Sequence, residues 1–144
     1  MLSIVDVPQQ PDVILDVRFE EGLLLLSVKN IGSKPAINVS VRFKKRLVGI
    51  DGTKIVSALP LFRNIAFLAP QKEIETFLDT SASYFKRRQP SQIEATIRYK
   101  DVSGARFEAF VSHDLAIYKE IGYVRRAQPD RDGFRSTTGS PFSR

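Results

Sequence analysis

Cysteine is absent from this chain of 144 residues, and its absence excludes several kinds of site. Without Cys there is no disulfide framework, no thiolate nucleophile and no cysteine-based zinc or iron–sulfur centre. Histidine occurs once, at His113, which leaves too few ligands for a typical zinc site. The chain is still long enough to bury a core without disulfides or metals, so we expect one domain plus tails and no cofactor.

Long apolar runs are also lacking. A run such as residues 23–26 is far shorter than the ~20 residues that a membrane-spanning helix needs. The first residues show no basic stretch followed by a continuous apolar one, and they include Asp6, Asp12 and Asp16, which is not typical of a signal peptide. We therefore expect a cytoplasmic protein, either free or at the periphery of a membrane complex.

Catalytic motifs are missing as well. The isolated glycines Gly49, Gly52 and Gly104 fall in predicted turns, so no glycine-rich phosphate loop is present. Asp114 follows His113, but neighbours in a strand point to opposite faces, and a carboxylate so placed cannot orient a catalytic histidine. No Ser or Thr sits in a recognisable nucleophile elbow. We expect no enzymatic activity and a structural or exposed His113.

Two short motifs match known patterns only in part. Residues 130–133 start like a calcium-binding loop, but no acidic residue follows Asp132. Asn38-Val39-Ser40 matches the sequon for N-glycosylation, but Asn38 falls in a predicted strand. We expect neither calcium nor a glycan at these positions.

What the chain has in quantity is the alternation of apolar and polar residues. Residues 12–19 and 24–28 alternate on either side of a short turn, which predicts a hairpin. Residues 93–99 and 107–111 do the same around a turn that contains Gly104, and they predict a second hairpin. The Asp51-Gly52 pair predicts a two-residue turn in a third.

The stretch KNIGSKPAINVSVRF, residues 29–43, combines a turn with a strand. Asn30 and Gly32 tolerate left-handed backbone, which favours a sharp turn. The strand that follows is expected to place four apolar side chains on the core face, namely Ile37, Val39, Val41 and Phe43. We interpret this stretch as a turn rather than a ligand site.

The middle of the chain has a less regular pattern. Pro60 and Pro70 bracket apolar residues and restrict any helix between them, so we expect an irregular strand there. Residues 73–78 predict a further strand, and residues 80–88 predict a short helical turn capped by Thr80 or Ser81.

Seven to eight short strands with almost no helix predict an all-β protein. We expect a single immunoglobulin-like antiparallel β-sandwich over residues 12–118, and a closed barrel is the next choice. Residues 1–11 form an N-terminal extension. Residues 119–144 form a polar, basic tail whose composition cannot bury enough apolar surface to order itself, so a partner would have to hold it in place.

Three pieces of this pattern occur together in a known family. They are Asn30-Ile31-Gly32 before Pro35-Ala36 and the alternating strand, Leu68-Ala69-Pro70 before Glu73-Ile74-Glu75, and the hairpin of residues 95–108. The set resembles the bacterial immunoglobulin-like sandwiches of the CARDB (cell-adhesion-related) type, over roughly residues 12–118. Gln71 stands where that family usually has glycine. The resemblance implies a binding or scaffolding domain without chemistry of its own.

Basic residues outnumber acidic ones, with a formal net charge of +6. Two clusters in the domain form a predicted basic patch, made of Arg42, Lys44, Lys45, Arg46, Lys86, Arg87 and Arg88. If both clusters lie on one edge, they would suit phosphates, and Tyr84 and Phe85 would offer stacking faces. The alternative is that these cations keep the sheet soluble and guard its edges.

The tail carries half of the net charge, with 6 basic against 3 acidic residues in residues 119–144. Its aromatic residues alternate with arginines, which suits anchors on a partner. The predicted partner-binding residues are Tyr123, Arg125, Arg126, Arg131, Phe134, Arg135 and Phe142. We expect a non-catalytic protein–protein interaction module, an accessory or adaptor subunit of a larger complex. The alternative is an electrostatic binder of nucleic acid or of an anionic membrane surface.

Overall fold

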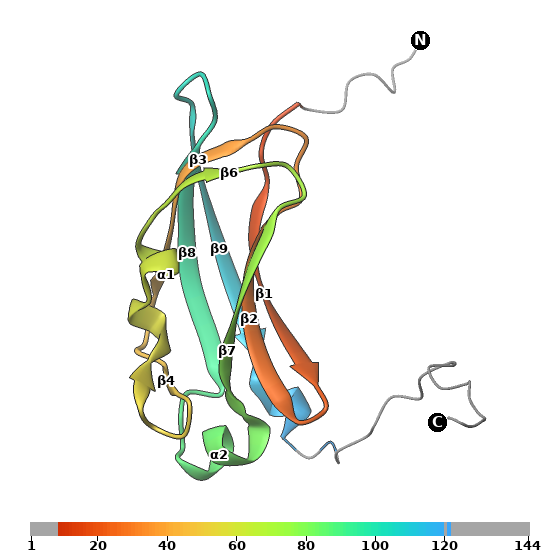
Figure 1. Ribbon diagram of the computed structural model, residues 1–144, viewed down its shortest axis with the longest axis vertical. Helices are drawn as coiled ribbons and strands as arrows, with labels where there is room; N and C mark the ends of the chain where they lie inside the picture. The colour runs from red at the N-terminus through yellow and green to blue at the C-terminus, as the bar shows by residue number, and fades with distance from the viewer. Residues whose placement is uncertain (1–8, 120, 122–144) are drawn as a thin grey trace, which may run out of the picture.

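Two antiparallel β-sheets pack against each other in the computed structural model, which describes residues 9–119 and 121 (Figure 1). Sheet A has the strand order β1-β2-β7 and sheet B the order β6-β3-β8-β9, and no strand pair joins the two sheets within the described residues. The predicted β-sandwich is confirmed, and the closed barrel is wrong. The strands are β1 (Val13–Glu20), β2 (Leu23–Asn30), β3 (Ala36–Phe43), β6 (Ile65–Leu68), β7 (Glu73–Thr80), β8 (Gln92–Lys100) and β9 (Arg106–Asp114).

A small two-stranded ribbon and four short helices complete the described fold. Figure 1 shows the ribbon and α1 beside sheet B, and α2 at the end of the sandwich below them. The elements are β4 (Val48–Gly49), β5 (Lys54–Ile55), η2 (Val56–Ala58), α1 (Pro60–Arg63), α2 (Ser81–Lys86) and η3 (Leu115–Tyr118). None of the helices in the described part of the chain is long and apolar enough to cross a bilayer.

The core lies between the sheets and is formed by the predicted alternating residues. In β8 the side chains of Ile93, Ala95, Ile97 and Tyr99 are buried, and the residues between them point outward. The other strands contribute the same way, with the buried residues Val13, Leu15, Val17, Leu24, Leu26, Val28, Val39 and Val41. Each fully buried Val or Leu stabilises the fold by about 1.5–3 kcal/mol. The two hairpins predicted from alternation, β1–β2 and β8–β9, are confirmed.

The first residues of strand β3 do not follow the expected alternation. Asn38 has a positive φ of 53°, and the register with β8 shifts between Ile37 and Ser40. This bulge inserts one residue, so Ala36 and Val39 both face the core. Ile37 was expected on the core face with Val39, but it is only half-buried.

The turn before β3 is formed differently from the prediction. Neither Asn30 nor Gly32 has left-handed backbone. The buried Asn30 amide instead accepts hydrogen bonds from the N–H groups of Asp12 and Gly32 and donates to the carbonyls of Lys34 and Leu68. Gly32 is needed because a Cβ there would collide with the backbone of residues 10–12. This Asn30 cluster ties the end of sheet A to β6 of sheet B.

The middle segment also differs from the expected irregular strand. It begins with η2 and α1, and only then continues as the short strand β6. Pro60 is the first residue of α1, where a helix needs no amide hydrogen. The helix buries Phe62, which is 1% exposed, and thereby covers the core next to β3.

The predicted Asp51-Gly52 hairpin exists, but its turn is longer than two residues. Gly49 pairs with Lys54, which leaves a four-residue loop in which Ile50, Asp51 and Gly52 all have positive φ. The Ile50 N–H donates to the Leu78 carbonyl of β7 at 2.8 Å, so the loop is held by sheet A as well as by its own Gly52 N–H to Gly49 carbonyl bond.

Beyond β7 the predicted helical turn is confirmed. Thr80 caps α2 by accepting a hydrogen bond from the Ser83 N–H at 3.1 Å. Asp79, 1% exposed, forms an ion pair with Arg87 just after α2. Arg87 also donates to the Val48 carbonyl at 3.0 Å. This polar cluster fastens α2, β7 and the β4–β5 ribbon to one another.

Candidate functional site

The outer face of sheet B carries three rows of side chains, because strand register places outward residues opposite one another. The first row has Lys44, Glu94 and Ser112, the middle row has Arg42, Thr96 and Phe110, and the third has Ser40, Arg98 and Glu108. Their neighbours in sequence point into the core, which fixes these residues on the solvent side.

The first and third rows neutralise their own charges. Lys44 Nζ lies 3.4 Å from Glu94 Oε1, and Arg98 Nε donates to Glu108 Oε2 at 2.6 Å. Cross-strand pairs of this kind are the usual way in which a solvated sheet face is stabilised. These two rows therefore flank the middle row with short-range ion pairs.

The middle row has no such compensation. Arg42 is exposed and forms no ion pair with any described residue. Phe110 is 77% exposed, although it stands at the centre of a strand. The small Thr96 separates the two and leaves both side chains accessible. An uncompensated arginine and an exposed aromatic residue thus share one line across the sheet.

A hollow of about 460 Å³ opens beside this face, between the second half of β3 and the η2–α1 segment. We call it the β3–α1 hollow. It forms because β6 is short and pairs with β3 only as far as Val39. Among the described residues that line it, none is acidic. Its basic lining residues are Arg42, Lys45, Arg46, Arg63 and Arg98.

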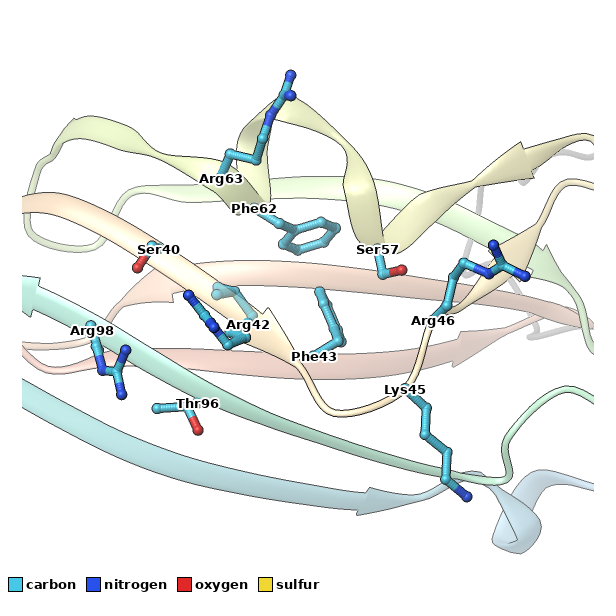
Figure 2. A pocket seen from close by; sticks show the side chains of 11 residues that line it. Ser40, Arg42, Phe43, Lys45, Arg46, Ser57, Phe62, Arg63, Thr96 and Arg98 are labelled. Carbon is cyan, nitrogen blue, oxygen red and sulfur yellow. The ribbon is translucent and has the colours of Figure 1, made fainter.

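Aromatic rings separate the cations of the hollow. Phe43 and Phe62 lie edge to face with ring centroids 4.9 Å apart. Figure 2 shows the cationic groups spread around these rings, with Arg63 on the α1 side and Arg42 and Arg98 on the β3–β8 side. The Ser57 hydroxyl accepts a hydrogen bond from the Leu47 N–H at 2.9 Å, which fixes the loop that carries Arg46. The arrangement suits several negative charges spaced apart.

The predicted basic patch is thus divided by the structure. Arg42, Lys45 and Arg46 line the hollow, whereas Lys44 is paired with Glu94. The second cluster begins at the last residue of α2 and continues just beyond it, where Arg87 is bound to Asp79. Lys86 and Arg88 are exposed there and form no ion pair with any described residue.

One predicted stacking residue is not available to a ligand. Tyr84 is fully buried, its hydroxyl donates to the Pro90 carbonyl at 2.6 Å, and its ring packs edge to face on Phe85. Burial raises the pKa of Tyr84 well above its ordinary value. The expectation that Tyr84 offers a stacking face is wrong, and Phe85 is partly buried against the core. The predicted tail residues, from Tyr123 to Phe142, lie outside the described residues.

His113 has a structural environment. Its Nε2 lies 2.7 Å from the Leu15 carbonyl of β1, and since a carbonyl can only accept, this nitrogen carries the hydrogen. The bond links the free edge of sheet A to β9 of sheet B. Asp114 caps η3 by accepting from the Ala116 N–H and does not orient the imidazole. Within residues 9–119 and 121, no three acidic or histidine side chains gather as a metal site.

Three residues of the site escaped the sequence reasoning. Arg63 and Arg98 stand far apart in sequence, and only the pairing of β3 with β8 and the packing of α1 bring them to one hollow. Phe110 did leave a signal, because it falls on the polar face of an alternating strand whose apolar positions are Phe107, Ala109 and Val111.

Comparisons with known proteins identify a family for this chain. Neither the search of curated proteins nor the search of solved structures found a match. Residues 6–119, which include every described strand and helix, match the family model whose description is "Domain of unknown function (DUF8453)". The chain therefore belongs to this family.

Proposed function

We propose that this chain is a non-catalytic protein–protein interaction module, an accessory or adaptor subunit that docks its partner on the outer face of sheet B. The observation that supports this is the middle row, in which Arg42 lacks an ion pair within the described part of the chain and Phe110 is 77% exposed. Arginine and aromatic residues are enriched among the residues that contribute most to protein interfaces.

The flanking rows fit the same function. An interface gains most where a central anchor is desolvated, while surrounding polar contacts exclude water. The ion pairs Lys44–Glu94 and Arg98–Glu108 stand on the two sides of the middle row, where such a rim belongs. A partner covering all three rows would remove Phe110 from water and give Arg42 a counter-charge.

Photo-crosslinking tests this assignment. A benzophenone side chain at position 110 replaces one aromatic group by another and is expected to give one discrete adduct with a partner from the native source. The matched control carries the same group at Glu73, an exposed position on sheet A. Adducts that form equally at both positions, or only at position 73, would refute docking on sheet B.

The tail is proposed to add contacts around this face, through its alternating arginines and aromatic residues. A chain that ends at residue 118 is expected to keep the unfolding transition of the sandwich and to bind its partner more weakly. Partner capture that is unchanged after truncation would remove the tail from the proposal.

Binding of nucleic acid or an anionic membrane surface is the second candidate, and the basic lining of the β3–α1 hollow favours it. Phosphate binding of this kind weakens steeply as salt rises, because counterions are released on association. Affinity for an oligonucleotide or for anionic vesicles that does not change between low and moderate salt would exclude this candidate.

A further inference from the structure

The β3–α1 hollow has a backbone edge as well as cations. The Lys44 N–H donates to the Glu94 carbonyl at 2.8 Å, so at this register the even-numbered residues of β3 bond to β8. In an antiparallel ladder the odd-numbered residues then point the other way. The backbone groups of Val41 and Phe43 therefore face the side that β6 leaves open, and both residues line the hollow.

An unpaired strand edge next to cations selects an extended, acidic ligand. Extended peptides bind exposed edges by adding a strand, and main-chain hydrogen bonds supply much of the affinity. Figure 2 shows the guanidinium groups of Arg42, Arg46 and Arg63 around the aromatic rings instead of at one point. A single small anion would contact only part of this set, whereas a peptide can carry carboxylates at several places.

We propose that the β3–α1 hollow receives an extended acidic segment of the partner protein, which adds as a strand to the free edge of β3 and places carboxylates on Arg42, Arg46 and Arg63. This inference rests on the proposed function and names the chemistry of the partner. The segment and the face of sheet B meet at Arg42, which lines the hollow and also stands in the middle row.

A nucleic-acid strand fits the same surface less well. Phe62, 1% exposed, is too deeply buried to stack on a base, and Phe43 packs against it. Phe110 is accessible, but Glu94 and Glu108 stand in the rows on either side of it, where a phosphate chain crossing the sheet would meet them. Neutral main-chain hydrogen bonding along an edge is also a property of peptides and not of nucleic acids.

Fluorescence anisotropy with the full chain tests the inference. The probe is a labelled peptide of alternating glutamate and alanine, and its controls are the matching glutamine peptide and an oligonucleotide of equal charge. The chain is expected to bind the glutamate peptide most tightly. In two further peptides, every second peptide bond is N-methylated, starting at an odd-numbered bond in one and at an even-numbered bond in the other. Only one of these patterns removes the N–H donors that would face β3, so only that peptide is expected to bind more weakly.

The variant set assigns this binding to the hollow. Replacing Arg42, Arg46 and Arg63 by Gln is expected to weaken the glutamate peptide about tenfold, because each exposed ion pair contributes about twofold. The matched control removes the same charge elsewhere, by replacing Lys34, Lys54 and Lys72, which are all exposed and do not line the hollow. Both triple variants should unfold like the parent chain.

The outcomes separate this inference from the proposed function. Three results would each overturn the proposal of an acidic segment. They are equal losses of affinity in the two triple variants, tighter binding of the oligonucleotide than of the glutamate peptide, and no effect of either N-methylation pattern. If the benzophenone at position 110 still captures a partner in those cases, docking on sheet B stands without it. If the peptide binds the hollow but position 110 gives no adduct, the proposed function fails and the peptide site stands.

Discussion

The outer faces of the two sheets differ in whether a central arginine is paired. On sheet A the cation Arg18 of β1 is shared between Glu20 and Glu75, and Glu75 raises the pKa of Arg18 above its ordinary value. On sheet B, Arg42 and the neighbouring Arg63 have no acidic partner within the described residues. The same strand architecture thus gives one face on which Arg18 is paired with two carboxylates and another on which Arg42 forms no ion pair with a described residue, although Lys44 and Arg98 beside it are paired.

The buried ion pair between Asp79 of sheet A and Arg87 gives the largest expected effect on stability. Asp79→Ala removes the buried carboxylate and leaves Arg87 without its ion pair, together with the unpaired amides of Asp51 and Thr80. Removing one member of a buried pair costs about 3–5 kcal/mol. Urea denaturation measures this, and Lys86→Ala on the exposed side of α2 is the control, expected within about 0.5 kcal/mol. A loss as small as that of the control would mean that the cluster is not structural.

The join between the sheets gives the next largest effect. Asn30→Ala removes the amide that accepts from two N–H groups and donates to two carbonyls, one of them the Leu68 carbonyl of β6. Stranding buried backbone groups is expected to cost about 2–3 kcal/mol. The control is Asn64→Ala at an exposed position, which should change the free energy of unfolding by about 0.5 kcal/mol or less. Equal effects of the two substitutions would contradict the role of the Asn30 cluster.

Paired phenylalanines sharpen the contrast between stability and binding. The Phe77 side chain of β7 is half-buried, so folding removes part of its ring from water. Phe77→Ala is therefore expected to lower the free energy of unfolding by about 1–2 kcal/mol. Phe110→Ala is expected to change it by about 0.5 kcal/mol or less but to weaken partner binding about tenfold or more. Denaturation and partner capture of both variants measure this. A Phe110→Ala protein that is destabilised as much as Phe77→Ala would place that ring in the fold and not in an interface.

The smallest effect is a pH response in the β8–β9 turn of sheet B. The Ser103 hydroxyl, helped by the backbone N–H groups of Ser103, Gly104 and Ala105, lowers the pKa of Asp101. A lowered folded-state pKa contributes stability above the ordinary carboxyl range, and that stability is lost as pH falls through the lowered value. The protection factors of the Ser103 and Ala105 amides against hydrogen exchange, which correct for the intrinsic pH dependence of exchange, should therefore fall in acid. Asp101→Ala should lower these protection factors at neutral pH and remove their acid response, and an unchanged response in the variant would exclude this carboxyl.

Local pattern was sufficient to predict the hairpins and most of the core. Alternation around a turn places residues 93–99 correctly because pairing partners there are close in sequence. Asn30 and Gly32 were recognised as special, but their reasons are a four-bonded amide and a close backbone approach, which depend on residues 10–12 and Leu68. Propensity alone cannot reveal contacts of that kind.

The candidate site was predictable only in part, for a similar reason. Arg42, Lys45 and Arg46 were identified as a run of basic residues, yet their companions Arg63 and Arg98 come from other elements. Which cations remain unpaired is decided by cross-strand register, as Lys44 shows by meeting Glu94. A sequence supplies the charges but does not state which of them its own fold will neutralise.

The bulge at Asn38 has a consequence for how the strand β3 can change over time. Side chains along a regular strand alternate between the two faces of the sheet with a period of two. Adding or removing one residue at one end therefore moves the side chains of the rest of the strand to the opposite face. The extra residue at the bulge lets the two halves of β3 alternate independently. Ala36 pairs with β6 on one side of the bulge, while Arg42 keeps its outward direction on the other. Inserting or deleting one residue near the Asn30 turn is therefore expected to leave Arg42 on the outer face of sheet B.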